Sequence, residues 1–343
     1  MRIAIIGYGG VGKALIRLLE DKKNLLTKED IEIQVNYIIE YMGGIYQNSG
    51  IELKKLIEFT NTQKDITKHE KFGENINIDT ILENKDIDLA VLMTPTNKDT
   101  GEPGRTIIKR MLNAGINVAI SDKGPAMTAY KELSELAKKN NVQFCIGCTT
   151  GGALPTINGG MIEMAGAEIE SIEGVLNGTT NFILKEMEEQ QVGYDEALKK
   201  AQELGIAETN PALDVEGWDT AGKLLILTNV HMGADKKLSD IEVEGITELT
   251  VDEINKAKSE GKKYKLVGKT IKCGSDCKMT VKLEKLGQEH LLYNVDGKNK
   301  AVRFTSDSLG DLVIIGGASG VTPAAASILR DIINIIRGYK FCR

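Results

Sequence analysis

Ile3-Ala-Ile-Ile-Gly-Tyr-Gly-Gly-Val-Gly12 is the stretch of sequence that decides the fold of the first part of the chain. Its first four residues are apolar, which is typical of a short buried strand. The glycines that follow predict a tight turn, and apolar residues then recur at helical spacing from Val11 to Glu20. The stretch therefore predicts a strand, a turn and a helix in direct succession.

The alternation of strand and helix continues beyond this helix. Apolar runs predict further strands at Ile31–Ile39, Asp88–Met93, Asn117–Ile120 and Val142–Ile146, with helices at Gly104–Ala114 and Tyr130–Asn140. Strands that alternate with helices form a parallel sheet with helices on its faces. We therefore predict an α/β fold with a Rossmann-type dinucleotide-binding domain over residues 1–150.

The pattern changes after Gly152. Helices are predicted at Ile157–Met164, Phe182–Gln191, Asp195–Leu204 and Trp218–Asn229, and a polar, strand-rich stretch follows at Lys265–Val302. This is typical of an α+β domain with a partly solvated sheet, and we assign residues 151–312 to this second domain. Residues 313–343 combine a glycine loop with a helix of small residues, which we expect to pack back on the first domain.

Composition and charge exclude several classes of partner. The 343 residues include 49 acidic and 43 basic side chains without a basic tract, which argues against nucleic acid or an anionic membrane. No apolar run reaches the roughly 18 residues that a membrane span needs, and no signal peptide precedes the first strand. We therefore expect a cytoplasmic protein.

The five cysteines are spread along the chain, which predicts reduced thiols and not a disulfide framework. Cys145-Ile-Gly-Cys148 has the spacing of some redox and zinc sites, but no second pair of ligands completes such a site. Structural thiols are the better interpretation. Cys342 near the C-terminus is a candidate for a cross-link between subunits under oxidising conditions.

The glycine turn matches the G-x-G-x-x-G pattern of dinucleotide-binding sites. Gly7 allows the tight turn, Gly9 lets the backbone approach a pyrophosphate, and Gly12 lets the helix pack closely on the strand. Gly10 and Val11 open the helix, whose N-terminal N–H groups are free to bind phosphate. We predict a nicotinamide dinucleotide site here; a glycine turn without a ligand is the alternative.

An acidic residue at the end of the second strand binds the ribose hydroxyls in such sites, and Glu40 stands at this position. No arginine beside it is suited to receive a 2′-phosphate, which favours NAD over NADP. The alternative is that Glu40 is a surface carboxylate at a strand end. Thr94, Pro95, Lys123 and Gly317 complete the predicted cofactor set.

Two lysines stand at positions suited to chemistry. Lys123 follows the predicted strand Asn117–Ile120 and so lies at the carboxyl edge of the sheet, where ligands bind in open α/β folds. Lys223 lies four residues after Asp219 on a predicted helix, and a helical ion pair is the simplest interpretation. However, Leu224-Leu-Ile-Leu227 is apolar on every side, which predicts a buried helix whose charged residues need a partner or a function.

Several motifs together resemble those of homoserine dehydrogenase, in order and spacing. They are Asp122-Lys-Gly-Pro125, Thr149-Thr-Gly-Gly-Ala-Leu-Pro155, Gly178-Thr-Thr-Asn181, Ala207-Glu-Thr-Asn-Pro211, the Asp214–Lys223 stretch and Gly320-Val-Thr-Pro-Ala-Ala-Ala326. The resemblance spans nearly the whole chain, and it implies that residues 151–312 form a substrate, catalytic and dimerisation domain. It implies NAD(P)-dependent interconversion of L-aspartate 4-semialdehyde and L-homoserine, in the biosynthesis of threonine, methionine and isoleucine, by a homodimer.

The resemblance also implies roles for particular residues. Lys223 matches the catalytic acid/base, and Lys123 matches a second lysine at the reacting oxygen. The substrate residues that it implies are Glu208, Asp214, Asp219, Gly178 and Thr179. Taken without the resemblance, Glu208 is equally compatible with a surface acid at a helix end, and Asp214 with a helix cap.

Two positions depart from the family pattern. In the family a monovalent cation such as Na⁺ is held by backbone carbonyls, which here are those of Gly147, Thr150, Gly152 and Leu154. Many members carry glutamate where this chain has Gly147, which puts the cation in question. Asp122 stands where the family commonly has asparagine, which puts the role of Lys123 in question.

Two other functions are compatible with the same residues. One is a dehydrogenase on this scaffold that acts on a different short amino acid, and the other is a non-catalytic dinucleotide sensor. The helix of small residues is followed by too few residues for another domain. We therefore expect the short form of the family, without a C-terminal regulatory domain.

Overall fold

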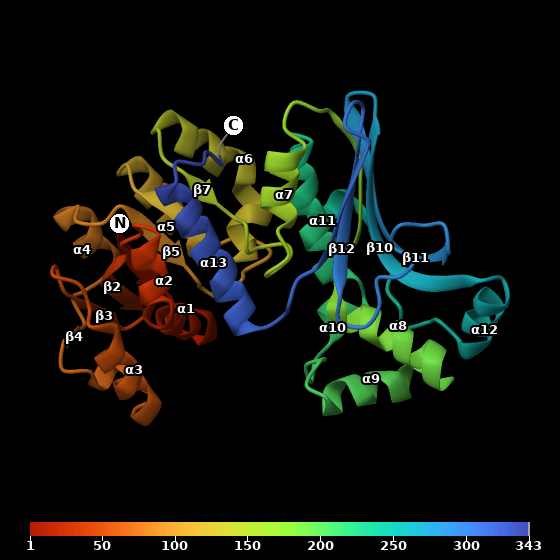
Figure 1. Ribbon diagram of the computed structural model, residues 1–343, viewed down its shortest axis with the longest axis horizontal. Coiled ribbons are helices and arrows are strands. Elements are labelled where there is room, and N and C mark those ends of the chain that lie inside the picture. The colour runs from red at the N-terminus through yellow and green to blue at the C-terminus, as the bar shows by residue number, and fades with distance from the viewer. Residues whose placement is uncertain (342–343) are drawn as a thin grey trace. The chain divides into compact units, whose positions relative to one another are not determined.

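The chain divides into two compact units in the computed structural model, which describes residues 1–341 (Figure 1). The first unit contains Met1–Thr149 and the chain from Gly320 onward, and the second contains Thr150–Ser319. Cys342, the candidate for a cross-link, lies outside the described residues. No helix of the described part of the chain is long and apolar enough to span a membrane.

A seven-stranded sheet in the order β4-β3-β2-β1-β5-β6-β7 forms the centre of the first unit. Its strands are β1 (Arg2–Ile6), β2 (Gln34–Glu40), β3 (Gly43–Tyr46), β4 (Phe72–Gly73), β5 (Leu89–Leu92), β6 (Asn117–Ile120) and β7 (Phe144–Cys145). Five of them, β2, β1, β5, β6 and β7, pair in parallel. The side chains of β1 from Ile3 to Ile6 are buried, as expected for a strand covered on both faces.

The helices of the first unit come from both ends of the chain. They are α1 (Gly10–Asp21), α2 (Lys23–Lys28), α3 (Leu53–Thr62), η1 (Ile66–Lys68), α4 (Ile78–Asn84), α5 (Gly104–Asn113), α6 (Lys123–Lys139) and α13 (Val321–Ile336). Figure 1 shows α13, in blue, beside α1, in red, and the two helices are in contact. The prediction of a Rossmann-type domain with a returning C-terminal helix is therefore confirmed.

One edge of this sheet differs from the prediction. β3 runs antiparallel to β2, and β4 runs antiparallel to β3. Glu40 pairs with Gly43, so only Tyr41 and Met42 join β2 to β3. A two-residue connection can join only antiparallel strands, because a parallel pair needs a crossover. The expectation of a parallel sheet was therefore wrong at this edge.

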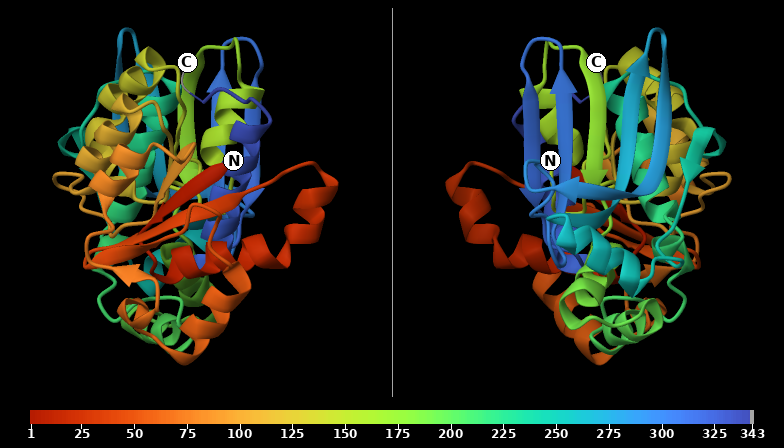
Figure 2. Two further views of the ribbon diagram at one scale, coloured as in Figure 1. Left: turned by 90° about the vertical axis from the view of Figure 1, so that its left-hand side faces the viewer. Right: turned by 90° about the vertical axis from the view of Figure 1, so that its right-hand side faces the viewer.

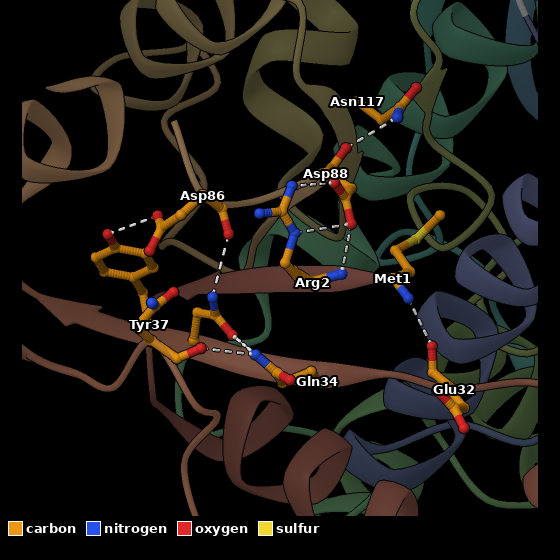
Figure 3. Close-up of polar contacts among 10 residues, drawn as sticks. Met1, Arg2, Glu32, Gln34, Tyr37, Asp86, Asp88 and Asn117 are labelled. Carbon is orange, nitrogen blue, oxygen red and sulfur yellow. Dashed lines mark hydrogen bonds and ion pairs between the residues drawn. The ribbon is translucent and has the colours of Figure 1, made fainter. Parts of the chain in front are cut away.

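Polar contacts tie together the amino ends of the parallel strands (Figure 3). The guanidinium of Arg2 pairs with the carboxylate of Asp88 at 2.7 Å. The carboxylate of Asp86 accepts the hydroxyl groups of Tyr37 at 2.7 Å and of Tyr46 at 2.8 Å. Burial raises the pKa of the Tyr37 hydroxyl well above its usual value. These contacts stand at the opposite end of the strands from the glycine turn, so they fix the sheet without entering the site.

Tyr37→Phe removes a hydroxyl that donates to Asp86 and accepts from Asn84 at 2.8 Å. Asp86 and Asn84 each lose a hydrogen bond beside the buried ring of Tyr37. We therefore expect the free energy of unfolding to fall by about 1–2 kcal/mol. Urea titration measures the change. Tyr339→Phe is the control, since Tyr339 is 47% exposed, and should leave the midpoint unchanged. An unchanged midpoint in Tyr37→Phe would contradict this role.

The second unit is built on a six-stranded sheet in the order β13-β12-β8-β10-β11-β9. Its strands are β8 (Ile169–Val175), β9 (Ile241–Val243), β10 (Lys262–Cys273), β11 (Asp276–Gly287), β12 (Lys300–Ser306) and β13 (Asp311–Gly316). The right-hand view of Figure 2 shows these strands side by side. The pairs are antiparallel except for β9 and β11, so the α+β prediction is confirmed.

Helices cover one face of this sheet and connect its strands. They are α7 (Thr156–Glu163), α8 (Gly178–Gln190), α9 (Tyr194–Glu203), α10 (Ala212–Val215), α11 (Trp218–His231), η2 (Leu238–Asp240) and α12 (Val251–Ser259). The hydroxyls of Thr228 on α11 and Thr270 on β10 lie 2.7 Å apart. Leu224 to Thr228 of α11 are all buried, so the apolar run correctly predicted a buried helix.

The opposite face of the sheet carries charged side chains. Glu173 on β8 pairs with Lys269 on β10 at 3.2 Å and with Arg303 on β12 at 3.5 Å. Successive side chains of a strand point to opposite faces of the sheet. Lys269 therefore lies on the face away from Thr270, which contacts α11. The sheet therefore packs against α11 on one face, while its other face combines this charged group with a buried apolar cluster that includes Val267.

The last part of the second unit extends further along the chain than the sequence boundary at residue 312. β13 pairs with β12 from Asp311 to Gly316, so its β-branched residues Val313 to Ile315 belong to the second sheet. The return to the first unit begins at Gly320. The glycine-rich sequence after Ile315 hid this strand, because glycine is uncommon in strands.

Candidate functional site

The glycine turn contains two glycines that the protein backbone requires. Gly7 has a φ of +93°, and a Cβ atom there would lie 2.7 Å from the carbonyl oxygen of Met93. A Cβ atom on Gly12 would lie 2.6 Å from the carbonyl oxygen of Gly7. Both residues therefore allow strand, turn and helix to pack closely.

Gly9 is different, because a Cβ atom there would meet no protein atom within 4 Å. The protein itself therefore gives no steric reason for glycine at this position. Gly9 caps α1 without a side-chain hydrogen bond, so the N–H groups at the start of the helix remain available to a phosphate. The open space and the free donors fit a bound pyrophosphate. At the next position, a Cβ atom on Gly10 would lie 3.0 Å from Val321 of α13.

Glu40 is the last residue of β2 and lies against the glycine turn. Its carboxylate accepts a short hydrogen bond from the backbone N–H of Tyr8, so it is not simply a surface carboxylate at a strand end. Tyr41 and Met42, which follow it, are 98% and 60% exposed. No lysine or arginine occurs from Tyr41 to Leu53. A negative charge thus stands at the edge of the turn where a ribose would bind.

Lys123 is the first residue of α6 and comes three residues after the end of β6, at the carboxyl edge of the sheet as the sequence predicted. Asp122 is the N-cap of this helix and is 1% exposed. Its carboxylate accepts the N–H of Gly124 at 2.9 Å and the hydroxyl of Thr94 at 3.1 Å. Burial raises the pKa of Asp122 above its usual value, although these hydrogen bonds oppose the shift. Pro95, next to Thr94, is exposed.

The second unit holds the other lysine in a nearly closed polar cluster. Lys223 lies on α11 and donates from Nζ to the carbonyl oxygen of Leu176 at 2.9 Å and, by a short bond, to the carboxylate of Asp219. The side chains of Lys223 and Asp219 are 14% and 12% exposed. The helix starts at this place because Gly217 has a φ of +90°, which allows the sharp turn into α11.

Asn177 joins this cluster to the start of α8. Its Oδ1 accepts the N–H of Thr180 at 2.9 Å, which caps the helix. Its Nδ2 donates to Asp214 at 2.6 Å and to Asp219 at 2.8 Å. Sequence reasoning named Gly178 and Thr179 of this segment and missed the bridging side chain of Asn177. The signal was an asparagine immediately before a helix, which is a common cap.

The remaining predicted substrate residues lie on neighbouring segments. Gly178 begins α8, and a Cβ atom there would lie 3.0 Å from the carbonyl oxygen of Lys298. Thr179 donates its hydroxyl to the carbonyl oxygen of Ile206 at 3.1 Å, which ties α8 to the segment that carries Glu208. Glu208 is exposed on this loop. The structure therefore brings Asp214, Asp219 and Lys223 together and leaves Glu208 outside their hydrogen-bonded cluster.

Two charged side chains from distant parts of the sequence contact the loop that is predicted to hold a cation. The N–H of Gly147 donates to the carboxylate of Asp331 on α13 at 3.0 Å, and a Cβ atom at 147 would lie 2.6 Å from both carboxylate oxygens. The ammonium of Lys300 donates to the carbonyl oxygen of Gly151 at 2.8 Å, and Lys300 is 5% exposed. A positive charge therefore already stands against this loop, at the carbonyl oxygen of Gly151, which in sequence lies between the predicted ligands Thr150 and Gly152.

Leu154 and Gly317 make backbone contacts beside this loop. The carbonyl oxygen of Leu154 accepts the N–H of Thr156 at 2.8 Å. Gly317 has a φ of +77°, and a Cβ atom there would lie 2.7 Å from the backbone nitrogen of Leu154. Among the described residues, no group of three or more His, Cys, Asp or Glu side chains is arranged to hold a metal ion.

The glycine turn, the carboxylate at the end of β2 and the lysine clusters define the class of protein, which is a nicotinamide-dependent oxidoreductase with a Rossmann fold. A family model described as an oxidoreductase family with an NAD-binding Rossmann fold matches residues 1–148. The model of homoserine dehydrogenase matches residues 155–333. The chain belongs to the homoserine dehydrogenase family.

Individual relatives agree with this family. The homoserine dehydrogenase of Methanocaldococcus jannaschii is 37% identical over 340 residues, which cover 99% of this chain and 100% of the relative. An NAD(+)-dependent homoserine dehydrogenase of Pseudomonas canavaninivorans is 30% identical, over 97% of this chain and 96% of the relative. A mutant of a hyperthermophilic archaeal homoserine dehydrogenase, solved in complex with NADPH, has a TM-score of 0.84 and 26% identity, covering 100% of this chain and 99% of that chain.

The open space at Gly9 generates a test of the cofactor site. We expect Gly9→Ala to retain the melting temperature of the free protein, since the new methyl group meets no protein atom. It should weaken NADH binding about tenfold or more, because the methyl group occupies space needed for the pyrophosphate. Fluorescence titration and thermal melting measure the two effects. Gly193→Ala, also in open space but in the second unit, is the control and should bind normally. Unchanged binding in Gly9→Ala would contradict the site.

The buried carboxylate of Asp122 predicts how the stability of the fold depends on pH. The pKa of Asp122 is higher in the folded chain than its unfolded value of about 3.9, so folding favours the protonated form. The wild type should therefore lose stability relative to Asp122→Asn as the pH rises from about 4 toward 7, while asparagine keeps the helix cap.

Thermal melting of both proteins across this pH range measures the difference. Asp99→Asn, which changes an exposed carboxylate, is the control and should show no pH-dependent gap. A gap that stays constant, or that closes as the pH rises, would overturn the assignment of Asp122.

Proposed function

We propose that the chain catalyses the reversible, NAD(P)-dependent conversion of L-homoserine to L-aspartate 4-semialdehyde. The observation that carries the proposal is the bonding of Lys223. An ammonium group has three donors, and among the described residues those of Lys223 bond to Asp219 and Leu176. One donor of Nζ is left for the oxygen of a substrate, and the side chain of Lys223 is only 14% exposed.

The geometry supports an acid/base role for this lysine. A bound nicotinamide supplies or accepts the hydride at the reacting carbon. As the carbonyl oxygen of the semialdehyde gains negative charge, Lys223 stabilises it and donates a proton. In the direction of homoserine oxidation, the neutral amine accepts the proton of the alcohol. Asp219 keeps Nζ in place in both directions through the same hydrogen bond.

The acidic residues suit the amino group of the substrate. Asp214 and Asp219 present two carboxylates within one hydrogen-bonded cluster, held by the amide of Asn177. Carboxylates attract an ammonium group, so we assign them to the α-amino group of L-homoserine. Glu208 is exposed, and we propose that it contributes charge at the entrance to this cluster. Lys123 remains our candidate for a second contact to the reacting oxygen.

We propose NAD as the preferred cofactor. The carboxylate of Glu40 beside the turn would accept the ribose hydroxyls of NAD and would repel the 2′-phosphate of NADP. The absence of lysine and arginine from Tyr41 to Leu53 leaves no cation there to balance such a phosphate. The relative from Pseudomonas canavaninivorans is named as NAD(+)-dependent. The homodimer and the cytoplasmic location remain predictions from the sequence.

Initial-rate assays with L-homoserine against NAD and NADP separately test the substrate and the cofactor. We expect turnover with L-homoserine and a higher kcat/KM with NAD. Turnover of another hydroxy amino acid with none for L-homoserine would establish a different dehydrogenase on this scaffold. Binding of dinucleotide without turnover of any hydroxy amino acid would favour the sensor.

Lys223→Arg tests the acid/base role without removing the charge that Asp219 needs. A guanidinium is not deprotonated in proteins, so it cannot exchange the proton. We expect kcat to fall by about 10²–10⁴-fold while the melting temperature changes little. Lys185→Arg on α8, where the lysine pairs with Glu189 at the surface, is the matched control and should retain full activity. Retained turnover in Lys223→Arg would contradict the role.

A further inference from the structure

Lys300 is a buried lysine that the mechanism does not use. It is the first residue of β12 and is only 5% exposed. A buried ammonium group requires hydrogen-bond acceptors, because its transfer out of water is otherwise very unfavourable. One acceptor is the backbone carbonyl oxygen of Gly151, at 2.8 Å. The charge of Lys300 is therefore directed into the loop that leads to α7.

This loop is built from backbone groups and glycines. The N–H of Leu154 donates to the carbonyl oxygen of Gly151 at 3.2 Å, and Gly152 has a φ of +61°. A Cβ atom on Gly151 would overlap the carbonyl oxygen of Leu154, so only glycine allows this close turn. Carbonyl oxygens brought together in this way attract a positive charge. The Nζ of Lys300 also lies 3.7 Å from the position of a Cβ atom on Gly152.

The same loop is the one for which the family resemblance implied a free monovalent cation. Position 147 cannot carry the usual glutamate, because Asp331 occupies the space that its side chain needs. We propose that the ammonium of Lys300 is the built-in cation of the loop Thr150–Leu154, and that the protein needs no free monovalent cation there. A tethered ammonium does not dissociate, so the order of the loop becomes independent of the salt present. Lys300 is thus a positioning residue.

The test uses the wild type and two lysine variants. Melting temperatures and initial rates are measured in NaCl, KCl and choline chloride at equal ionic strength. Lys300→Met removes the ammonium from the loop. Lys265→Met is the matched control, since Lys265 is also buried in the second unit but donates to Asn181, Val295 and Asp296.

We expect the wild type to give the same melting temperature and the same rates in all three salts. Lys300→Met should melt several degrees lower in choline chloride and show a lower kcat/KM. NaCl or KCl should restore part of both losses in a saturable way, because a free cation then enters the loop. Lys265→Met should lose stability equally in all three salts.

A saturable rise in the wild-type melting temperature with Na⁺ or K⁺ over choline would overturn the proposal, as would a Lys300→Met variant that responds like Lys265→Met. If Lys300→Met does not fold, the wild-type comparison decides alone. The rate measurement rests on the proposed function, whereas the melting temperature does not. A failure of the proposed function would therefore remove the rates and leave the salt test intact.

Discussion

The carboxylate of Asp219 is the group on which the arrangement of the second unit depends. It accepts the ammonium of Lys223 from its own helix and the amide of Asn177 from the start of α8. With an exposure of 12%, this carboxylate is largely out of water, so the loss of either donor would leave a poorly compensated charge. The surrounding side chains of α11 are buried and cannot shift to relieve it. One shared carboxylate thereby fixes the direction of the lysine.

Three other buried charges contact backbone groups near the end of an element. Asp122 caps α6, and Asp331 accepts the N–H of Gly147. Lys300 donates to the carbonyl oxygen of Gly151. These contacts satisfy backbone groups in loops and at a helix start, where regular secondary structure leaves donors and acceptors unpaired. In these three places, a buried charge holds the backbone of a loop or of a helix start.

The sequence allowed the local features to be predicted and left the long-range ones open. The glycine turn and the apolar run of α11 are encoded in adjacent residues, so periodicity and turn chemistry were sufficient for both. The bridge from Asn177 to Asp219 spans 42 residues, and the bond from Lys300 to Gly151 spans 149. Nothing in the local pattern around Lys300 distinguishes it from a surface lysine. The antiparallel β3 was missed because its short turn, Tyr41-Met42, contains neither glycine nor proline.

A crystal structure of the dead-end complex with NADH and L-homoserine is the most direct test of the central claim, which is that Lys223 exchanges the proton of the reacting oxygen. The account predicts the hydroxyl oxygen of L-homoserine within about 3 Å of Nζ of Lys223, with that nitrogen still bound to Asp219. The amino group of the substrate should face the carboxylates of Asp214 and Asp219. A hydroxyl oxygen bound to another side chain, with Lys223 bonded only to Asp219 and Leu176, would contradict it.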